Sequence, residues 1–278
     1  MPEGPVRSRL ARQAAEQALV RVVHHYGGTP GFVLLGGLVP ELLCSGSPVR
    51  HAGTVDVDVQ VNLEVSASST NAARLEQALL NAEFEVDSEL AWRWHSEIGG
   101  ARVVVKFELL ADLDDEPADR VLHFDNCQAL GAVNLRGTGF AALDFEPKTL
   151  SAKLGGVELT GKVNVAGLAG FLLAKAHAAY SRRQEKDWYD IAFVLLHNDA
   201  GGPEMAARLT RERFASKLVG STETALDDLL ANFADPTSQG PRAYASQTVI
   251  DAPGSSQAQL LADAILAVHT FYAGLFAP

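Results

Sequence analysis

The spacing of apolar residues along the first part of the chain switches between helical and extended periods. Between residues 7 and 26 apolar positions recur every three or four residues, which is typical of a surface helix. Residues 31–35 form an apolar run, which predicts a buried strand that ends at Gly36 and Gly37. In residues 54–61 acidic or polar residues alternate with valine, so we expect a strand with one polar and one apolar face.

The remaining segments follow the same two periods. We expect helices over residues 38–44, 69–81, 203–233 and 257–276, a long helix from Asn164 to about Leu195, and strands over residues 84–98 and 102–110. Residues 135–165 predict short strands in a bridge, and residues 235–256 predict a link rich in Pro, Ser and Gly. This order predicts an α/β (α+β) fold, with a mixed-sheet domain over residues 1–163 and a mainly helical domain over residues 164–278.

Composition indicates an acidic, globular protein. Of the 278 residues 47% are hydrophobic, enough for a full core, and the net charge is −11. That charge repels phosphate backbones, so nucleic-acid binding would need a local basic patch. The candidates for such a patch, which can equally be ordinary surface, are Arg7, Arg9, Arg12 and Arg21, and then Arg208, Arg211, Arg213 and Lys217.

Cysteine use and the two ends of the chain bear on its compartment. Cys44 and Cys127 are too few and too far apart for a disulfide framework or a thiolate zinc site, which favours a reducing cytoplasm. The first residues carry an early acid and prolines, unlike a secretory signal. The uncharged stretch over residues 264–278 is shorter than the roughly 18 apolar residues of a membrane span, so no membrane association is expected.

Asp56 and Asp58 are the first candidates for chemistry. They lie two residues apart on a predicted strand, so their carboxylates leave the same face and repel each other unless a cation intervenes. Hard divalent ions such as Mg²⁺ prefer oxygen ligands and are commonly held by carboxylates together with substrate phosphates. The alternative is that the two acids form the solvated face of an amphipathic strand.

Two further features complete a candidate phosphate and metal site. Gly36 and Gly37 lie between a buried strand and a helix start, where unobstructed backbone N–H groups can receive a phosphate, although an ordinary tight turn has the same sequence. Glu108 is the only acid in the apolar run over residues 102–110 and shares a face with Lys106, so we predict it as the third metal ligand. Asp112 has the same parity but lies beyond the strand end, and a solvated edge strand is the alternative for Glu108.

A cationic stripe is predicted on the long helix. At about 100° per residue, Arg182 lies about −20° and Lys186 about +20° from Lys175, so the three cations form a tripod suited to a polyphosphate. A solvated helix face is the alternative, and Glu185, Asp187 and Asp190 can supply part of the charge compensation.

Three segments together resemble a known family. Residues 34–37 (LLGG), 53–58 (GTVDVD) and 175–191 (KAHAAYSRRQEKDWYDI) look like nucleotidyltransferase-fold proteins of the AbiEii type, which include the MenT-like toxins. The resemblance spans roughly residues 30–197. It implies a core similar to DNA polymerase beta, transfer of a nucleotide from an NTP with tRNA 3′ ends among the acceptors, and a cognate antitoxin.

The resemblance also implies roles for single residues. By matching motif, Gly36 and Gly37 would hold the triphosphate, Asp56 and Asp58 would bind Mg²⁺ (or Mn²⁺), Lys175 with Arg182 or Arg183 would contact phosphates, and Asp187 or Asp190 would complete the nucleotide-binding helical motif. Two departures stand out. Leu38 replaces the Ser or Thr that generally follows the glycine pair, and Glu108 replaces an Asp.

The expected activity is metal-dependent transfer of a nucleotide to an acceptor hydroxyl, with pyrophosphate leaving. Asp56, Asp58 or Glu108 would accept the hydroxyl proton, and Lys175 would assist catalysis. The expected acceptor is a tRNA 3′ end, with a small hydroxylated molecule or a protein side chain as the alternatives. The alternative class is a catalytically degenerate nucleotidyltransferase-fold module that binds a nucleotide or a partner, a view that Leu38 favours.

Overall fold

The chain forms two compact units. The computed structural model describes residues 9–54, 56–61, 69–87, 90, 93–98 and 103–277. The first unit contains Met1–Val39 and Gly53–Ala166, and the second contains Pro40–Ala52 and Gly167–Pro278. The predicted domain boundary after residue 163 lies close to the junction at Ala166. Residues 40–52, which the sequence analysis assigned to the first domain, belong to the second unit.

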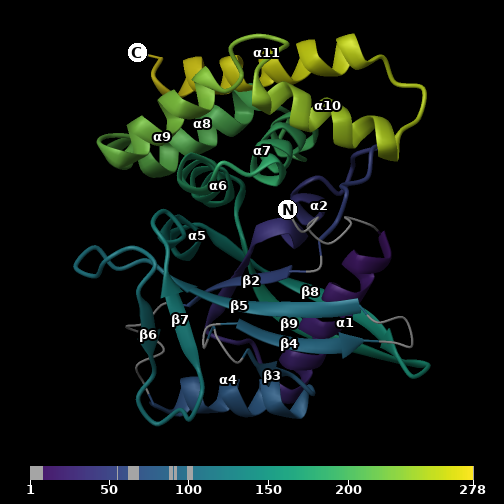
Figure 1. Cartoon of the computed structure of the whole chain (residues 1–278), viewed down its shortest axis with the longest axis vertical. Helices are drawn as coiled ribbons and strands as arrows, with labels where there is room; N and C mark the ends of the chain where they lie inside the picture. Colours follow the sequence, from purple (N-terminus) through teal and green to yellow (C-terminus); the bar gives the residue numbers. More distant parts are fainter. Residues whose placement is uncertain are drawn as a thin grey trace. The chain divides into compact units, whose positions relative to one another are not determined.

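A mixed sheet forms the centre of the first unit (Figure 1). Its strands are β1 (Phe32–Leu35), β2 (Asp56–Val61), β3 (Glu85–Val86), β4 (Arg93–Ile98), β5 (Val103–Ala111), β6 (Val121–His123), β7 (Gly131–Asn134), β8 (Phe145–Leu154) and β9 (Val157–Ala166). Among the described residues they follow the order β3-β4-β5-β2-β1-β9-β8, and β7 pairs with β5 and with β6. The pairs β1–β9, β2–β5 and β5–β7 are parallel, and the others are antiparallel.

Helices α1 (Arg9–Tyr26) and α4 (Ser69–Asn81) pack against each other, and α1 also contacts β5, β8 and β9. The short elements η1 (Gly36–Leu38) and α5 (Gly139–Leu143) complete the first unit. Val57 and Val59 of β2 are fully buried, as the alternation in this strand requires. The predicted fold class, a mixed-sheet α/β part followed by a mainly helical part, is confirmed.

The second unit is helical. Its helices are α2 (Val39–Leu43), which begins at the junction between the units, α6 (Leu168–Arg182), α7 (Glu185–His197), α8 (Pro203–Phe214), η2 (Ala215–Lys217), α9 (Ser221–Ala231), α10 (Gln239–Asp251) and α11 (Gln257–Leu275). Within this unit α10 packs against α7 and α11, and α11 also packs against α8.

Several sequence predictions about element boundaries are wrong. The single helix expected over residues 203–233 is α8, η2 and α9, and the single strand expected over residues 84–98 is β3 and β4. The long helix from Asn164 is two helices, since α6 ends at Arg182 and Arg183 adopts left-handed backbone angles with φ 49°. Asn164 lies in β9, so Gly167 and not Asn164 precedes the helix. Residues 145–166 form a hairpin of two ten-residue strands instead of a bridge of short ones. Most of the expected link over residues 235–256 is helix α10.

One helix of the described chain is long and apolar enough to cross a membrane by length and composition. It is α11, which reaches a mean hydropathy of 1.3. The sequence analysis predicted this helix but did not consider it as a membrane span, because Asp263 interrupts its uncharged stretch. Ala264, Val268 and Phe271 are buried, and 28% of the apolar window is buried inside the protein.

A buried carboxylate fixes the loop that precedes β7. Glu76 of α4 is 8% exposed and accepts hydrogen bonds from the backbone N–H groups of Gln128, Ala129 and Leu130 at 3.0, 2.6 and 2.9 Å. Replacing Glu76 by alanine leaves these donors without their acceptor. We expect the free energy of unfolding to fall by about 2 to 4 kcal/mol, measured by urea denaturation. An equal loss in the exposed control Glu85→Ala would contradict this role.

Candidate functional site

Strands β2 and β5 bring the predicted carboxylates together on one face of the sheet. In this parallel pair Asp58 lies opposite Glu108, and Asp56 lies opposite Lys106. The intervening residues Val57 and Phe107 are fully buried on the other face. Because side chains alternate along a strand, the two acids of β2 share their face with Glu108 and Lys106.

Strand β4 extends this polar face. Arg93 lies opposite Glu108 and His95 lies opposite Lys106 in the antiparallel pair β4–β5. The Nε of Arg93 donates to Oε1 of Glu108 at 2.6 Å. The face therefore has one row of Arg93, Glu108 and Asp58 and a second row of His95, Lys106 and Asp56. We call these six residues the polar face.

Glu108 has a raised pKa. Burial raises its pKa, and the neighbouring charge of Asp58 raises it further, while Arg93 opposes the shift; the resulting pKa is about 7. A carboxyl group with such a pKa can accept or release a proton near neutral pH.

The three predicted metal ligands are not arranged to coordinate a metal ion together. Among the residues that the structure describes, no group of three His, Cys, Asp or Glu side chains is placed to hold a metal ion. The reason at Glu108 is that its carboxylate is directed to Arg93, which supplies the neutralising charge instead. Asp56 and Asp58 nevertheless fit a hard cation in chemical type, because such an ion takes its other ligands from phosphates and water.

The glycine pair is explained by close contact with the acidic strand. Gly36 has φ +75°, and a Cβ at this position would lie 1.8 Å from Oδ2 of Asp58. A Cβ on Gly37 would lie 2.8 Å from Cβ of Thr54, whose Oγ1 accepts a hydrogen bond from the N–H of Asp56 at 3.0 Å. The turn over Gly36 and Gly37 therefore sets the backbone directly against the Asp56–Asp58 segment. Contact of this turn with a phosphate stays a prediction.

The neighbouring position 38 is part of the hydrophobic core. Leu38 is 1% exposed. It lies in the three-residue η1, and α2 after it has only five residues. The helix predicted over residues 38–44 is thus formed as the end of η1 and the short α2, and any phosphate contact here depends on the glycine backbone.

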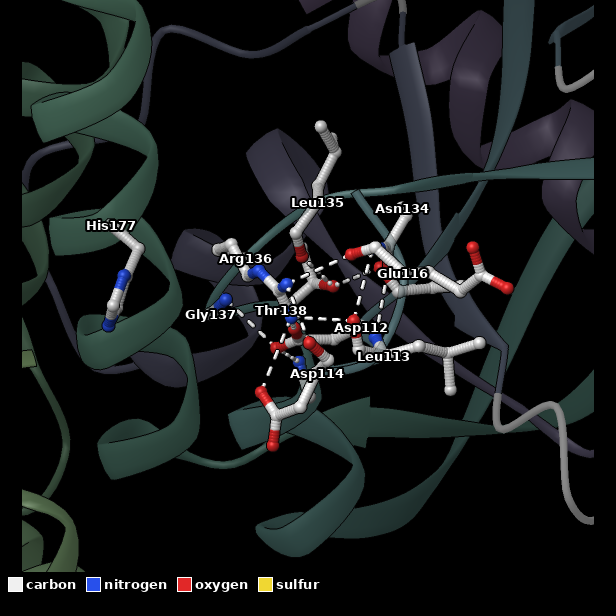
Figure 2. A network of polar contacts seen from close by, with 12 residues as sticks. Asp112, Leu113, Asp114, Glu116, Asn134, Leu135, Arg136, Gly137, Thr138 and His177 are labelled. Carbon is white, nitrogen blue, oxygen red and sulfur yellow. Dashed lines mark hydrogen bonds and ion pairs between the residues drawn. The ribbon is translucent and has the colours of Figure 1, made fainter. Parts of the chain in front are cut away.

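Asp112, the fallback for the third ligand, has a different role (Figure 2). Its Oδ2 accepts hydrogen bonds from the backbone N–H groups of Gly137 and Gly139 at 2.8 and 3.0 Å. Burial raises the pKa of Asp112, while these two hydrogen bonds oppose the shift. Asn134 and Arg136 bind backbone carbonyl groups of residues 113–117 in the same network. Asp112 therefore holds the turn before α5.

The predicted cationic stripe is wrong. Lys175 is 4% exposed, and its Nζ lies 3.0 Å from Oδ1 of Asp187 and 2.8 Å from Oδ2 of Asp190. Arg182 binds Asp187 with two nitrogens, at 2.7 and 2.8 Å. Because α6 ends at Arg182 and α7 begins at Glu185, Lys186 lies in a separate helix and the angles expected for one helix do not apply. Lys175, Asp187 and Asp190 form a buried ion network inside the second unit, and the exposed Arg182 joins it through Asp187.

His51 is a member of this network that sequence reasoning missed. Its Nε2 lies 2.9 Å from Oδ1 of Asp190, and both side chains are fully buried. The N–H of Ala52 donates to the hydroxyl of Tyr189 at 3.0 Å. These contacts explain why residues 40–52 belong to the helical unit. No local pattern signals them, because the partners lie about 140 residues apart in the chain.

Comparison with known proteins found no matching family model, no matching curated protein and no matching solved structure.

Proposed function

We propose that the protein is a metal-dependent nucleotidyltransferase whose reaction site is the polar face of the first unit. The observation that carries this proposal is the placement of Asp58 between Gly36 and Glu108, with Asp56 on the same face. Paired carboxylates beside a glycine turn suit a divalent cation together with the phosphates of an NTP. The resemblance to AbiEii-type proteins supports the same activity.

Each residue of the face has a definite task in this proposal. Asp56 and Asp58 would hold Mg²⁺ or Mn²⁺, which when bound stabilises charge on the transferred phosphate. Glu108, with a pKa of about 7, would accept the proton of the acceptor hydroxyl. The backbone at Gly36 and Gly37 would contact the triphosphate. Lys175 is not assigned a role in catalysis, because its ammonium is committed to Asp187 and Asp190.

The acceptor is proposed to be a hydroxyl group of a tRNA 3′ end or of a small molecule. The amino-terminal basic patch gives little support to RNA. Arg12 binds Glu16 and Arg21 binds Glu83, and the side chain of Arg12 is buried. Arg7 and the side chain of Arg9 lie outside the described residues. A cytoplasmic location, which the use of cysteine favours, and a cognate antitoxin, which the resemblance implies, belong to the same proposal.

A second candidate function is a nucleotide-binding or partner-binding module without turnover. Two observations favour it: Leu38 supplies no hydroxyl at the glycine turn, and Glu108 is directed to Arg93 instead of to the two aspartates. Binding of an NTP without product formation would distinguish this candidate from the enzyme.

The test is transfer of label from each α-³²P-NTP, with Mn²⁺ or Mg²⁺, to total RNA or to a mixture of small hydroxylated acceptors. We expect the double variant Asp56→Asn, Asp58→Asn to lose label transfer by at least about 100-fold. Asp125→Asn, at an exposed position, is the matched control and should transfer label like the wild type. Undiminished transfer by the double variant would refute the assignment.

A further inference from the structure

The polar face contains cations on the side away from Gly36. Arg93 of β4 and Lys106 of β5 lie in adjacent rows of the sheet, beside Glu108 and Asp56 respectively. The side chain of Arg93 is 24% exposed, and Lys106 is half-buried. Among the residues that the structure describes, the side chain of Lys106 forms no hydrogen bond or ion pair, while its backbone pairs with β2 and β4. A half-buried ammonium of this kind is available to an anion.

We propose that Arg93 and Lys106 are the polyphosphate-binding side chains of this site, and that the ion pair of Arg93 with Glu108 is exchanged for a phosphate when the nucleotide binds. This inference rests on the proposed function, since it names the groups that receive the substrate phosphates. It replaces the stripe of Lys175, Arg182 and Lys186, of which Lys175 and Arg182 are bound to carboxylates of their own unit.

The chemistry of the ion pair between Arg93 and Glu108 supports this assignment. A guanidinium binds a phosphate with two parallel N–H donors as readily as it binds a carboxylate, so a triphosphate can compete with Glu108 for Arg93. When Arg93 leaves, the carboxylate of Glu108 loses its compensating positive charge next to Asp58, which favours a cation on the face. Binding of the polyphosphate and binding of the cation are then mutually reinforcing.

Arg93 and Lys106 are therefore each expected to weaken binding of a divalent cation and to strengthen binding of a polyphosphate. Each positive charge repels a divalent cation bound alone and attracts a polyphosphate. Removing the charge with Arg93→Gln or Lys106→Gln is expected to strengthen binding of Mn²⁺ alone by about threefold and to weaken binding of inorganic triphosphate by about tenfold. A residue that only supports the fold would weaken both.

The experiment uses the full chain, with Mn²⁺ binding followed by electron paramagnetic resonance and inorganic triphosphate binding by calorimetry in the presence of Mn²⁺. Inorganic triphosphate removes any dependence on the base. Lys153→Gln, on the edge strand β8, makes the same charge change at an exposed position and should leave both affinities unchanged. Thermal denaturation checks that each variant is folded, and Lys106→Gln tests the proposal independently if Arg93→Gln does not fold.

Opposite shifts of the two affinities in either folded variant support the inference. Unchanged affinities, or a parallel loss of both, overturn it while the proposed function stands, provided that wild-type binding is lost in the variant Asp56→Asn, Asp58→Asn. If wild-type protein binds neither Mn²⁺ nor triphosphate, the proposed function itself fails.

Discussion

Replacing Lys175 by methionine is expected to lower the free energy of unfolding by about 3 to 5 kcal/mol. The ammonium of Lys175 lies within 3.0 Å of both Asp187 and Asp190, and the side chains of the two acids are fully buried. Without the ammonium the two carboxylates remain in an apolar interior with less compensating charge. Urea denaturation of the full chain, followed by far-ultraviolet circular dichroism, measures the loss.

The control for this variant removes the same charge at an exposed position of the same unit. Lys217→Met should change the free energy of unfolding by no more than about 0.5 kcal/mol. A Lys175→Met protein as stable as the wild type would show that the ion network contributes nothing to the fold, and Lys175 would again be a candidate for phosphate binding.

The pH dependence of this effect follows from the direction of the Asp187 shift. Burial raises the pKa of Asp187, but the charges of Lys175 and Arg182 outweigh burial and lower the pKa below its ordinary 3.8. A carboxylate with a lowered pKa stabilises the folded state above its unfolded pKa, and this contribution is lost as pH falls through the folded value. The difference between wild type and Lys175→Met should therefore be full near neutral pH and shrink below about pH 4.

The spacing of apolar residues alone was sufficient to predict the elements that have one buried face and one face exposed to solvent. Helices α1 and α4 and strands β2 and β5 appear close to their predicted positions, because each has a regular apolar stripe or alternation. Helix α11 was likewise predicted. The break between α6 and α7 was missed since Arg183, with φ 49°, is not a glycine and carries no usual stop signal. Helix α10 was missed because its sequence contains Gly240 and Pro241 near its start.

In the candidate site, too, the sequence predicted only what the pattern along a single strand determines. Parity along the strands was sufficient to place Asp56, Asp58 and Glu108 on one face, since residues two apart on a strand point to the same side. The contribution of Arg93 depends on the register of β4 against β5, which no local pattern fixes. The cationic stripe failed because its geometry assumed one unbroken helix through Arg182 and Lys186.

Replacing Gly36 by alanine is also expected to have a large effect on label transfer, because Gly36 lies in close contact with Asp58. Gly36→Ala adds a methyl group whose carbon would lie 1.8 Å from Oδ2 of Asp58, at a residue with φ +75°. The left-handed backbone costs an alanine about 1 to 2 kcal/mol, and the overlap forces the Asp58 carboxylate to move. If that carboxylate holds the catalytic cation, the variant should lose label transfer by at least about 100-fold, because small misplacements of reacting groups are this costly.

Gly31→Ala is the matched control for Gly36→Ala, since a Cβ on Gly31 meets no atom within 4 Å and its backbone is not left-handed. It should transfer label and bind Mn²⁺ like the wild type. Measuring Mn²⁺ affinity in both variants separates a displaced carboxylate from general destabilisation, because Gly36→Ala keeps every acidic side chain of the polar face. Undiminished transfer and Mn²⁺ binding in a folded Gly36→Ala protein would mean that Asp58 needs no fixed position against the turn, and the reaction site would then lie elsewhere.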